Sequence, residues 1–227
     1  MFFIAAVAYA ISIFIDVSVY HFKYYIQDDK NVRHLLAMIN IFQYSARFFI
    51  LIFMPIMAYL TESVKDKNEV WFATLLAHLL VILFLLPLYS HRFSSFFSKR
   101  VIIILNSLFG RSKVIELRNI EKKKKSFKII DLSNFYLFCI SYLAGFLFSF
   151  SITFLYYISF YYPQKALILS SITQVINMLG SMLLILFIDP RVMGAIDEGV
   201  GHKEIYTLTT SRIFVHVSLV VILFFIK

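Results

Sequence analysis

Arg47 is the residue of this sequence with the most unusual position for its charge. It lies near the middle of the apolar stretch HLLAMINIFQYSARFFILIFMPIMAYL (34–60), about 13 residues from either end. At ~1.5 Å per residue, that is roughly 20 Å from water on each side if the stretch is a membrane-spanning helix. An arginine side chain cannot reach water over that distance. The guanidinium therefore needs an internal counter-ion, a water-filled cavity or an anionic ligand, which is typical of transporter-like membrane proteins.

The polar neighbours of Arg47 leave more than one interpretation open. Asn40 and Gln43 precede it by seven and four residues, so all three share one face of a helix. Asp16 is the only acidic residue well inside another apolar segment, and it could be the counter-ion of Arg47. A shorter membrane segment over 48–60 would instead bring Arg47 to the headgroups. We favour a solvated cavity that receives an anion, because uncompensated cations within membranes are costly and rare.

A second polar face lies in the fifth apolar segment. Ser170, Gln174, Asn177 and Ser181 are spaced by four, three and four residues. Such a stripe can hold helices together through hydrogen bonds, or it can line a hydrophilic path. Two polar faces in one small protein favour a cavity that they share, with Asn40, Gln43, Gln174 and Asn177 as hydrogen-bonding groups.

Small residues form another stripe in the fourth segment. Ser141, Gly145, Ser149 and Thr153 recur at a spacing of four. Small side chains let helix backbones approach closely in membranes. We interpret this face as one that packs against another helix.

The segment IDPRVMGAIDEGVGHKEIYTLTTSR (188–212) follows the fifth apolar stretch. Pro190 disfavours helical geometry at Asp189, and Asp189 could cap a helix that begins after it. Arg191 and Arg212 bracket the segment. They are either ordinary cytoplasmic charges or groups that contact a lipid headgroup, with Asp189 as a possible coupling residue.

Composition identifies the class of protein. The chain has 227 residues, of which 60% are hydrophobic, well above soluble domains. It is therefore expected to be an all-α, polytopic membrane protein that forms a single transmembrane domain over 1–227. Six apolar stretches are long enough to span about 30 Å of hydrocarbon, at about 2–24, 35–60, 71–90, 132–161, 166–188 and 211–226.

The distribution of basic residues predicts the orientation. The chain carries a net charge of +9, and 17 of its 22 Lys and Arg residues lie in the connections 20–33, 91–131 and 189–212. The opposite side holds four. Basic connections stay in the cytoplasm, so both termini are predicted to lie outside. The protein is then a multi-pass protein of a cytoplasmic membrane.

The central connection has an additional feature. The stretch FSSFFSKRVIIILNSLFGRSK (93–113) mixes large apolar residues with basic ones, as interfacial amphipathic helices do. The run Lys122–Lys125 follows it. In so apolar a chain, anionic membrane lipids are the expected partner of these charges, and nucleic acid is not.

Catalytic motifs are missing from the sequence. It contains no Gly-rich phosphate loop, no GxSxG, no HExxH and no paired acidic motif of lipid-phosphate transferases. The single cysteine, Cys139, leaves no cysteine metal site. We therefore predict a protein that is not an enzyme and that needs no cofactor or metal.

Two stretches resemble a known family. LLAMINIFQYSARFF (35–49), with Asn40, Ser45 and Arg47 and the later Pro55, resembles the second span of the Amj family, the alternate lipid II flippases of bacteria. LFIDPRVMGAIDEGVGHKEIYTLTTSRIFVH (186–216) resembles the family's Asp-Pro-Arg segment and the connection into its last span.

The resemblance implies a lipid II flippase of the bacterial inner membrane. Such a protein moves the undecaprenyl-diphosphate-linked peptidoglycan precursor to the outer leaflet and serves cell-wall synthesis and cell shape. A guanidinium can grip a diphosphate through two parallel hydrogen bonds, so Arg47 is the expected contact. The alternatives are a transporter of a small anion or of another lipid-linked glycan, or a membrane scaffold in which Arg47 and Asp16 only join helices.

Overall fold

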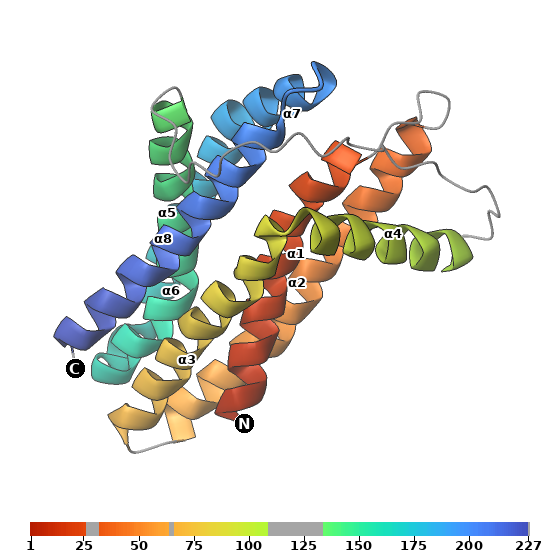
Figure 1. Cartoon of the computed structure of the whole chain (residues 1–227). Helices are drawn as coiled ribbons and strands as arrows, with labels where there is room; N and C mark the ends of the chain where they lie inside the picture. The colour runs from red at the N-terminus through yellow and green to blue at the C-terminus, as the bar shows by residue number, and fades with distance from the viewer. Residues whose placement is uncertain (26–31, 64–65, 109–133, 227) are drawn as a thin grey trace.

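A computed structural model describes residues 1–25, 32–63, 66–108 and 134–226 (Figure 1). These residues form helices and contain no strand, and six helical stretches among them are long and apolar enough to cross a membrane. The predicted all-α, polytopic fold is therefore confirmed. The elements are α1 (Phe2–Tyr25), α2 (Val32–Ser63), α3 (Lys67–Leu85), η1 (Leu86–Tyr89), α4 (His91–Leu108), α5 (Phe135–Tyr161), η3 (Pro163–Lys165), α6 (Ala166–Leu183), η4 (Leu184–Ile188), α7 (Asp189–Asp197) and α8 (His202–Ile226).

The long helices form two groups of three. In the first group, α1 packs chiefly on α2 and α3, and in the second, α5 packs chiefly on α6 and α8. The two groups meet mainly where α3 packs on α8. The chain termini lie at the same end of the bundle (Figure 1), and each helix of the second group runs in the opposite direction to the helix at the same place in the order of the first group.

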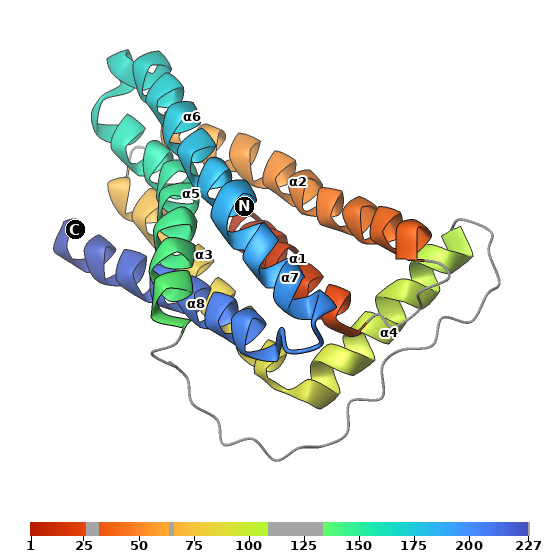
Figure 2. The ribbon, with the colours of Figure 1, turned by 90° about the horizontal axis from the view of Figure 1, so that it is seen from above.

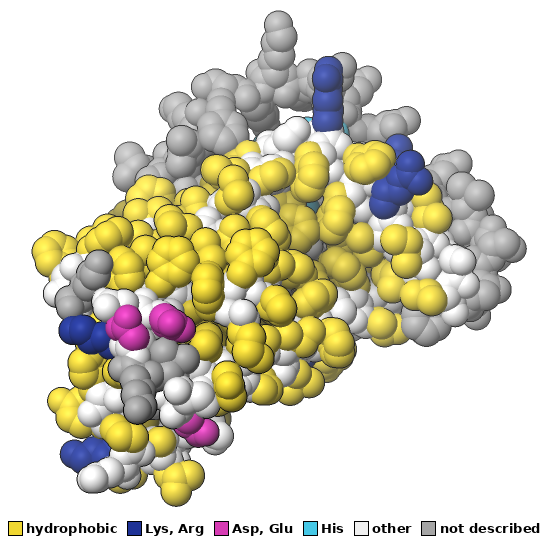
Figure 3. Space-filling view, turned by 90° about the horizontal axis from the view of Figure 1, so that it is seen from below, with side chains coloured by type: hydrophobic (Ala, Val, Ile, Leu, Met, Phe, Trp, Pro, Cys, Tyr) yellow, Lys and Arg dark blue, Asp and Glu magenta, His cyan; other side chains and the backbone are white. Residues whose placement is uncertain are grey.

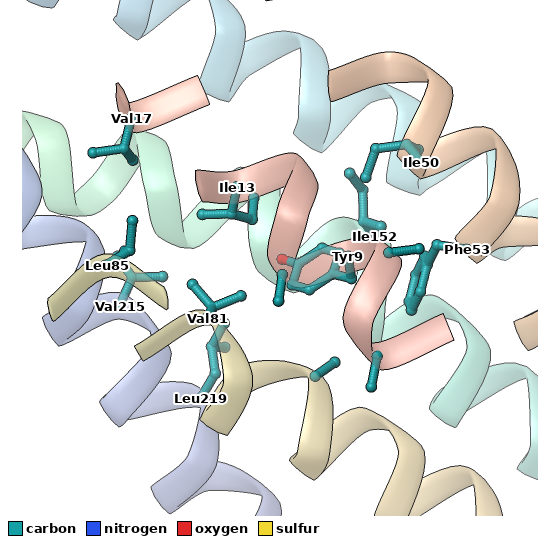
Figure 4. Close-up of a cluster of buried hydrophobic side chains, with 14 of the residues drawn as sticks. Tyr9, Ile13, Val17, Ile50, Phe53, Val81, Leu85, Ile152, Val215 and Leu219 are labelled. Atoms are coloured by element: carbon teal, nitrogen blue, oxygen red, sulfur yellow. The ribbon is translucent and has the colours of Figure 1, made fainter. Parts of the chain in front are cut away.

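Small residues place α1 at the centre of the bundle. Ala5, Ala6, Ala8 and Ala10 are all buried, and their short side chains allow neighbouring helices to approach. Tyr9 of α1 packs against α2, with its ring centroid 5.1 Å from that of Phe53 (Figure 4). In the most apolar window of α1, 67% of residues are buried, whereas the figure for the α6 stretch is 11%. Hence α6 is a peripheral helix whose apolar side chains face outward.

The hydropathy pattern predicts that the last span begins at residue 211. In the structure it begins at His202. The added turns are polar, but their hydroxyl groups are satisfied within the helix. Each donates to a backbone carbonyl three or four residues earlier, over 2.7–2.9 Å. Hydroxyls bonded in this way can lie inside an apolar environment. These residues are Thr207, Thr209, Thr210 and Ser211.

The predicted helix break at Asp189 does not occur. The π-helical turn η4 joins α6 to α7, and Asp189 itself has helical angles of φ −57 and ψ −50. A proline removes one backbone donor and crowds the preceding turn, and the wider π turn accommodates that change. Asp189 is thus not a helix cap, and the fifth stretch continues as far as Asp197.

The amphipathic helix predicted in the central connection is α4. It lies across the ends of α1 and α2 (Figures 1 and 2). Val101, Ile102 and Leu105 are buried against the bundle, while Ile103 and Ile104 are exposed. The basic run Lys122–Lys125 lies outside the described residues.

The outer surface of the bundle is apolar. Viewed from below (Figure 3), hydrophobic side chains cover most of the described surface of this face, and charged side chains are few. Such a surface suits contact with lipid and not with water.

Candidate functional site

A cavity of about 80 Å³ lies between the two helix groups. That volume accommodates several water molecules or a group the size of a phosphate. The cavity is lined by residues from α1, α2, α5 and α8 and from the junction of α6 with η4. These are Ile13, Asp16, Val17, Tyr20, Gln43, Arg47, Ala144, Phe148, Gly180, Ser181, Leu184, Leu208 and Arg212.

Three charged side chains line this cavity, namely Asp16, Arg47 and Arg212. Asp16 interacts electrostatically with both arginines, yet in the described residues it forms no direct salt bridge with either one. The cavity wall therefore carries two cations and one anion, with space between them. Asp189, outside the cavity, also interacts electrostatically with Arg212, but the cavity wall itself has an excess of positive charge that favours a bound anion.

Among the three charged residues of the cavity, Arg47 is the most exposed at the surface of the bundle. Its side chain is exposed, while Gln43, one turn earlier, is half-buried. The guanidinium carbon lies 6.0 Å from the ring centroid of Phe148 of α5, a cation–π arrangement across the two helix groups. Since Arg47 both lines the cavity and is exposed, the cavity opens sideways beside α2.

Arg212 reaches the cavity from the opposite group because Gly145 makes room for it. A Cβ atom at Gly145 would overlap Nη1 of Arg212 and would lie 3.1 Å from its Cδ and Cζ atoms. Gly145 belongs to the small-residue stripe of α5, all four residues of which are buried in the bundle. The stripe is therefore a packing face, as predicted. Gly145 in addition leaves space for the guanidinium of Arg212, which the sequence did not reveal.

Tyr20 links the cavity to the end of the bundle where α7 lies. It lines the cavity, and its hydroxyl donates a hydrogen bond to the carboxylate of Asp189. Lys23, one turn further along α1, also interacts electrostatically with Asp189. A line of polar groups therefore runs from the cavity to the junction of η4 and α7.

Replacing Tyr20 by phenylalanine is expected to destabilise the protein by about 1.5–3 kcal/mol, the usual worth of a hydrogen bond to a charged group. The matched control is Tyr142→Phe, since the Tyr142 hydroxyl donates to the neutral Ser218 hydroxyl over 2.8 Å, a bond worth about 0.5–1.5 kcal/mol. Thermal unfolding in detergent measures both variants. Equal losses would show that the bond of Tyr20 to Asp189 has no charged character.

Several residues predicted for the site do not line the cavity. Asn40 and Gln174 are exposed, and the Ser45 hydroxyl donates to the Phe42 carbonyl over 2.6 Å. Asn177 is half-buried one turn from Ser181. Arg191 is exposed at the start of α7, with its guanidinium carbon 5.8 Å from the ring centroid of Tyr136.

The structure brings together Asp16, Gln43, Arg47 and Arg212 of the predicted set, and Ser181 of the second polar stripe. Sequence reasoning missed Tyr20 and Gly145. A tyrosine near the end of an apolar segment resembles an ordinary interfacial residue, so no signal in the sequence distinguishes Tyr20. Within the described residues, no cluster of three or more His, Cys, Asp or Glu could hold a metal ion.

Comparisons of the chain with protein-family models, with curated proteins and with solved structures gave no match. Its function must therefore be inferred from the cavity and from the residues around it.

Proposed function

We propose that this protein moves a lipid-linked diphosphate, the undecaprenyl-diphosphate-linked peptidoglycan precursor, from the inner to the outer leaflet of a bacterial cytoplasmic membrane. The observation that carries the proposal is the pair Arg47 and Arg212. These two arginines come from different helix groups and line one cavity that is open beside α2. Two guanidinium groups can each bind a diphosphate through parallel hydrogen bonds.

The dimensions of the cavity agree with a headgroup held partly outside it. About 80 Å³ holds the phosphate portion, whereas the sugar-peptide headgroup needs a more open arrangement. The exposed position of Arg47 lets the polyprenyl chain stay in the lipid. The order of helix directions in one group is the inverse of that in the other, an arrangement that supports alternating access around a central site. Both termini then lie outside, and the basic connections lie where the headgroup loads.

Lipid II is preferred over other lipid diphosphates because of the resemblance to the Amj family at Asn40, Ser45, Arg47 and Pro55. The small volume of the cavity favours a second candidate, a transporter of a small anion. The sideways opening distinguishes the two, since a free anion has no need of an entrance from lipid.

The proposal is tested in bacteria depleted of their principal lipid II flippase. Expression of this protein is expected to restore growth and the outward exposure of lipid II. The double variant Arg47→Gln/Arg212→Gln, present in the membrane at equal abundance, is expected to restore neither. Lack of lipid II exposure with a well-expressed wild-type protein would rule the flippase out.

An Arg47→Lys substitution is expected to reduce transport about tenfold or more, because an ammonium group cannot make the two parallel hydrogen bonds of a guanidinium. A protein in which Arg47 only pairs with Asp16 should tolerate the change, since the charge is retained. Transport of labelled lipid II in proteoliposomes measures the effect.

The scaffold alternative predicts a different pattern. Arg47→Ala and Asp16→Ala would then lower the amount of folded protein equally, and the double substitution would restore it. That pattern would count against a ligand at Arg47.

A further inference from the structure

Two histidines that the proposed anion site does not use meet inside the bundle. His78 of α3 and His216 of α8 are both 0% exposed, and their Nδ1 atoms lie 2.9 Å apart. The ring of Tyr9 lies edge-on to both, with its centroid 5.9 Å from that of His78 and 6.1 Å from that of His216. Figure 4 shows Tyr9 among buried apolar side chains such as Ile13 and Phe53. The pair joins the two helix groups.

The surrounding hydrogen bonds determine which nitrogens carry protons in the neutral pair. The Thr153 hydroxyl donates to the Ser149 carbonyl over 2.7 Å, so its oxygen can only accept from Nε2 of His78, 3.3 Å away. His78 thus carries its proton on Nε2, and its Nδ1 is an acceptor. The contact between the two Nδ1 atoms then requires the proton of His216 to lie on Nδ1.

This assignment leaves Nε2 of His216 as an unprotonated acceptor. The atom is buried and has no hydrogen-bond partner among the described residues. Buried polar atoms without a partner are costly and uncommon. A proton bound to Nε2 would convert His216 to the imidazolium form, which retains the bond from its Nδ1 to His78.

Burial of the His216 ring opposes that protonation most, and the positive charge of Arg212 adds to the effect. Arg212 lies one turn before His216 on α8 and interacts electrostatically with it. The other titratable group that faces the pair is Tyr9 of α1, while α5 contributes the hydroxyl of Thr153. An anion bound to Arg212 would offset its charge and thereby favour a proton on His216.

We propose that the His78–His216 pair is a proton-binding site, occupied at Nε2 of His216 when an anion is bound at Arg212. The inference rests on the proposed anion site. The proton comes from bulk solvent, and no other bond forms or breaks. Because linkage is reciprocal, a bound proton strengthens anion binding by the same factor by which the anion strengthens proton binding.

The test measures protons taken up when undecaprenyl diphosphate binds to the full-length protein in nanodiscs. Calorimetric titrations in buffers of different ionisation enthalpy give the number of protons per bound lipid, over the range in which histidine ordinarily titrates. Wild type is expected to take up about one proton more than His216→Asn. Asparagine retains a donor towards His78 and removes Nε2, and the subtraction cancels protons that the lipid itself binds.

Two further variants make the result independent of one substitution. His216→Gln also removes the imidazole ring and is expected to lose the same proton, so it replaces His216→Asn if that protein does not fold. His21→Asn is the matched control, because both ring nitrogens of His21 have hydroxyl neighbours, Thr209 at 3.0 Å and Ser94 at 3.5 Å. It is expected to take up as many protons as wild type.

Each outcome has a distinct meaning. Binding with equal proton uptake in wild type and in both His216 variants overturns the proton site and leaves the anion site standing. Absence of binding in wild type overturns the anion site, and the coupling that rests on it.

Discussion

Replacing Arg212 by glutamine is expected to slow the translocation of lipid II in proteoliposomes by about tenfold to a hundredfold. Hydrogen bonds to charged groups contribute about 1.5–3 kcal/mol, which corresponds to that range. Arg212 is half-buried in the wall of the cavity, where glutamine cannot supply its charge or its paired donors. The loss should appear in the apparent affinity for lipid as well as in the rate.

The control for this substitution is Arg191→Gln. Arg191 precedes Arg212 by 21 residues, is exposed and lies against Tyr136 outside the cavity. Its loss should leave translocation within about twofold of wild type, since exposed charges contribute little. Equal losses in the two variants would show that basic charge in general, and not the cavity, supports transport.

A Gly145→Ala substitution is expected to weaken lipid diphosphate binding about tenfold, although it adds only one methyl group. The new Cβ atom would occupy the position of Nη1 of Arg212, so the guanidinium must leave its place. Overpacking of this kind costs about 1–3 kcal/mol. A lower melting temperature in detergent should therefore accompany the weaker binding.

Gly194→Ala is the matched control. Gly194 lies in α7, and a Cβ atom built there meets nothing within 4 Å. Alanine in a helix is favoured over glycine by about 0.5–1 kcal/mol, so this variant should be as stable as wild type or slightly more so. Unchanged binding in Gly145→Ala would mean that Arg212 does not hold the ligand from its observed position.

The fold and part of the candidate site could be predicted from the sequence. Apolar stretches of membrane length predict the six spans, and an arginine deep in one of them predicts a cavity. The place of Arg212 was not predictable in the same way. The polar stretch before it resembles a connection by hydropathy, and only the bonds from its hydroxyls to backbone carbonyls show that it belongs to α8.

The sequence also could not predict which residues of the two polar stripes meet across the helices. Asn40 and Gln174 share helix faces with residues of the cavity, but the cavity is short and includes only Gln43 and Ser181 of the two stripes. Helical periodicity gives the face on which a residue lies and not the depth at which a neighbouring helix meets it. The sequence left open whether Asp16 pairs with Arg47. In the structure, both residues line one cavity together with Arg212, and Asp16 interacts electrostatically with both arginines.

The most direct test of the proposed site is the equilibrium binding of undecaprenyl diphosphate to the purified protein in nanodiscs, with undecaprenol as the neutral reference. Saturable binding of the diphosphate but not of undecaprenol is expected for wild type, together with its loss in Arg47→Gln/Arg212→Gln. Equal binding of both lipids, or diphosphate binding that survives the double substitution, would contradict a diphosphate site between α2 and α8.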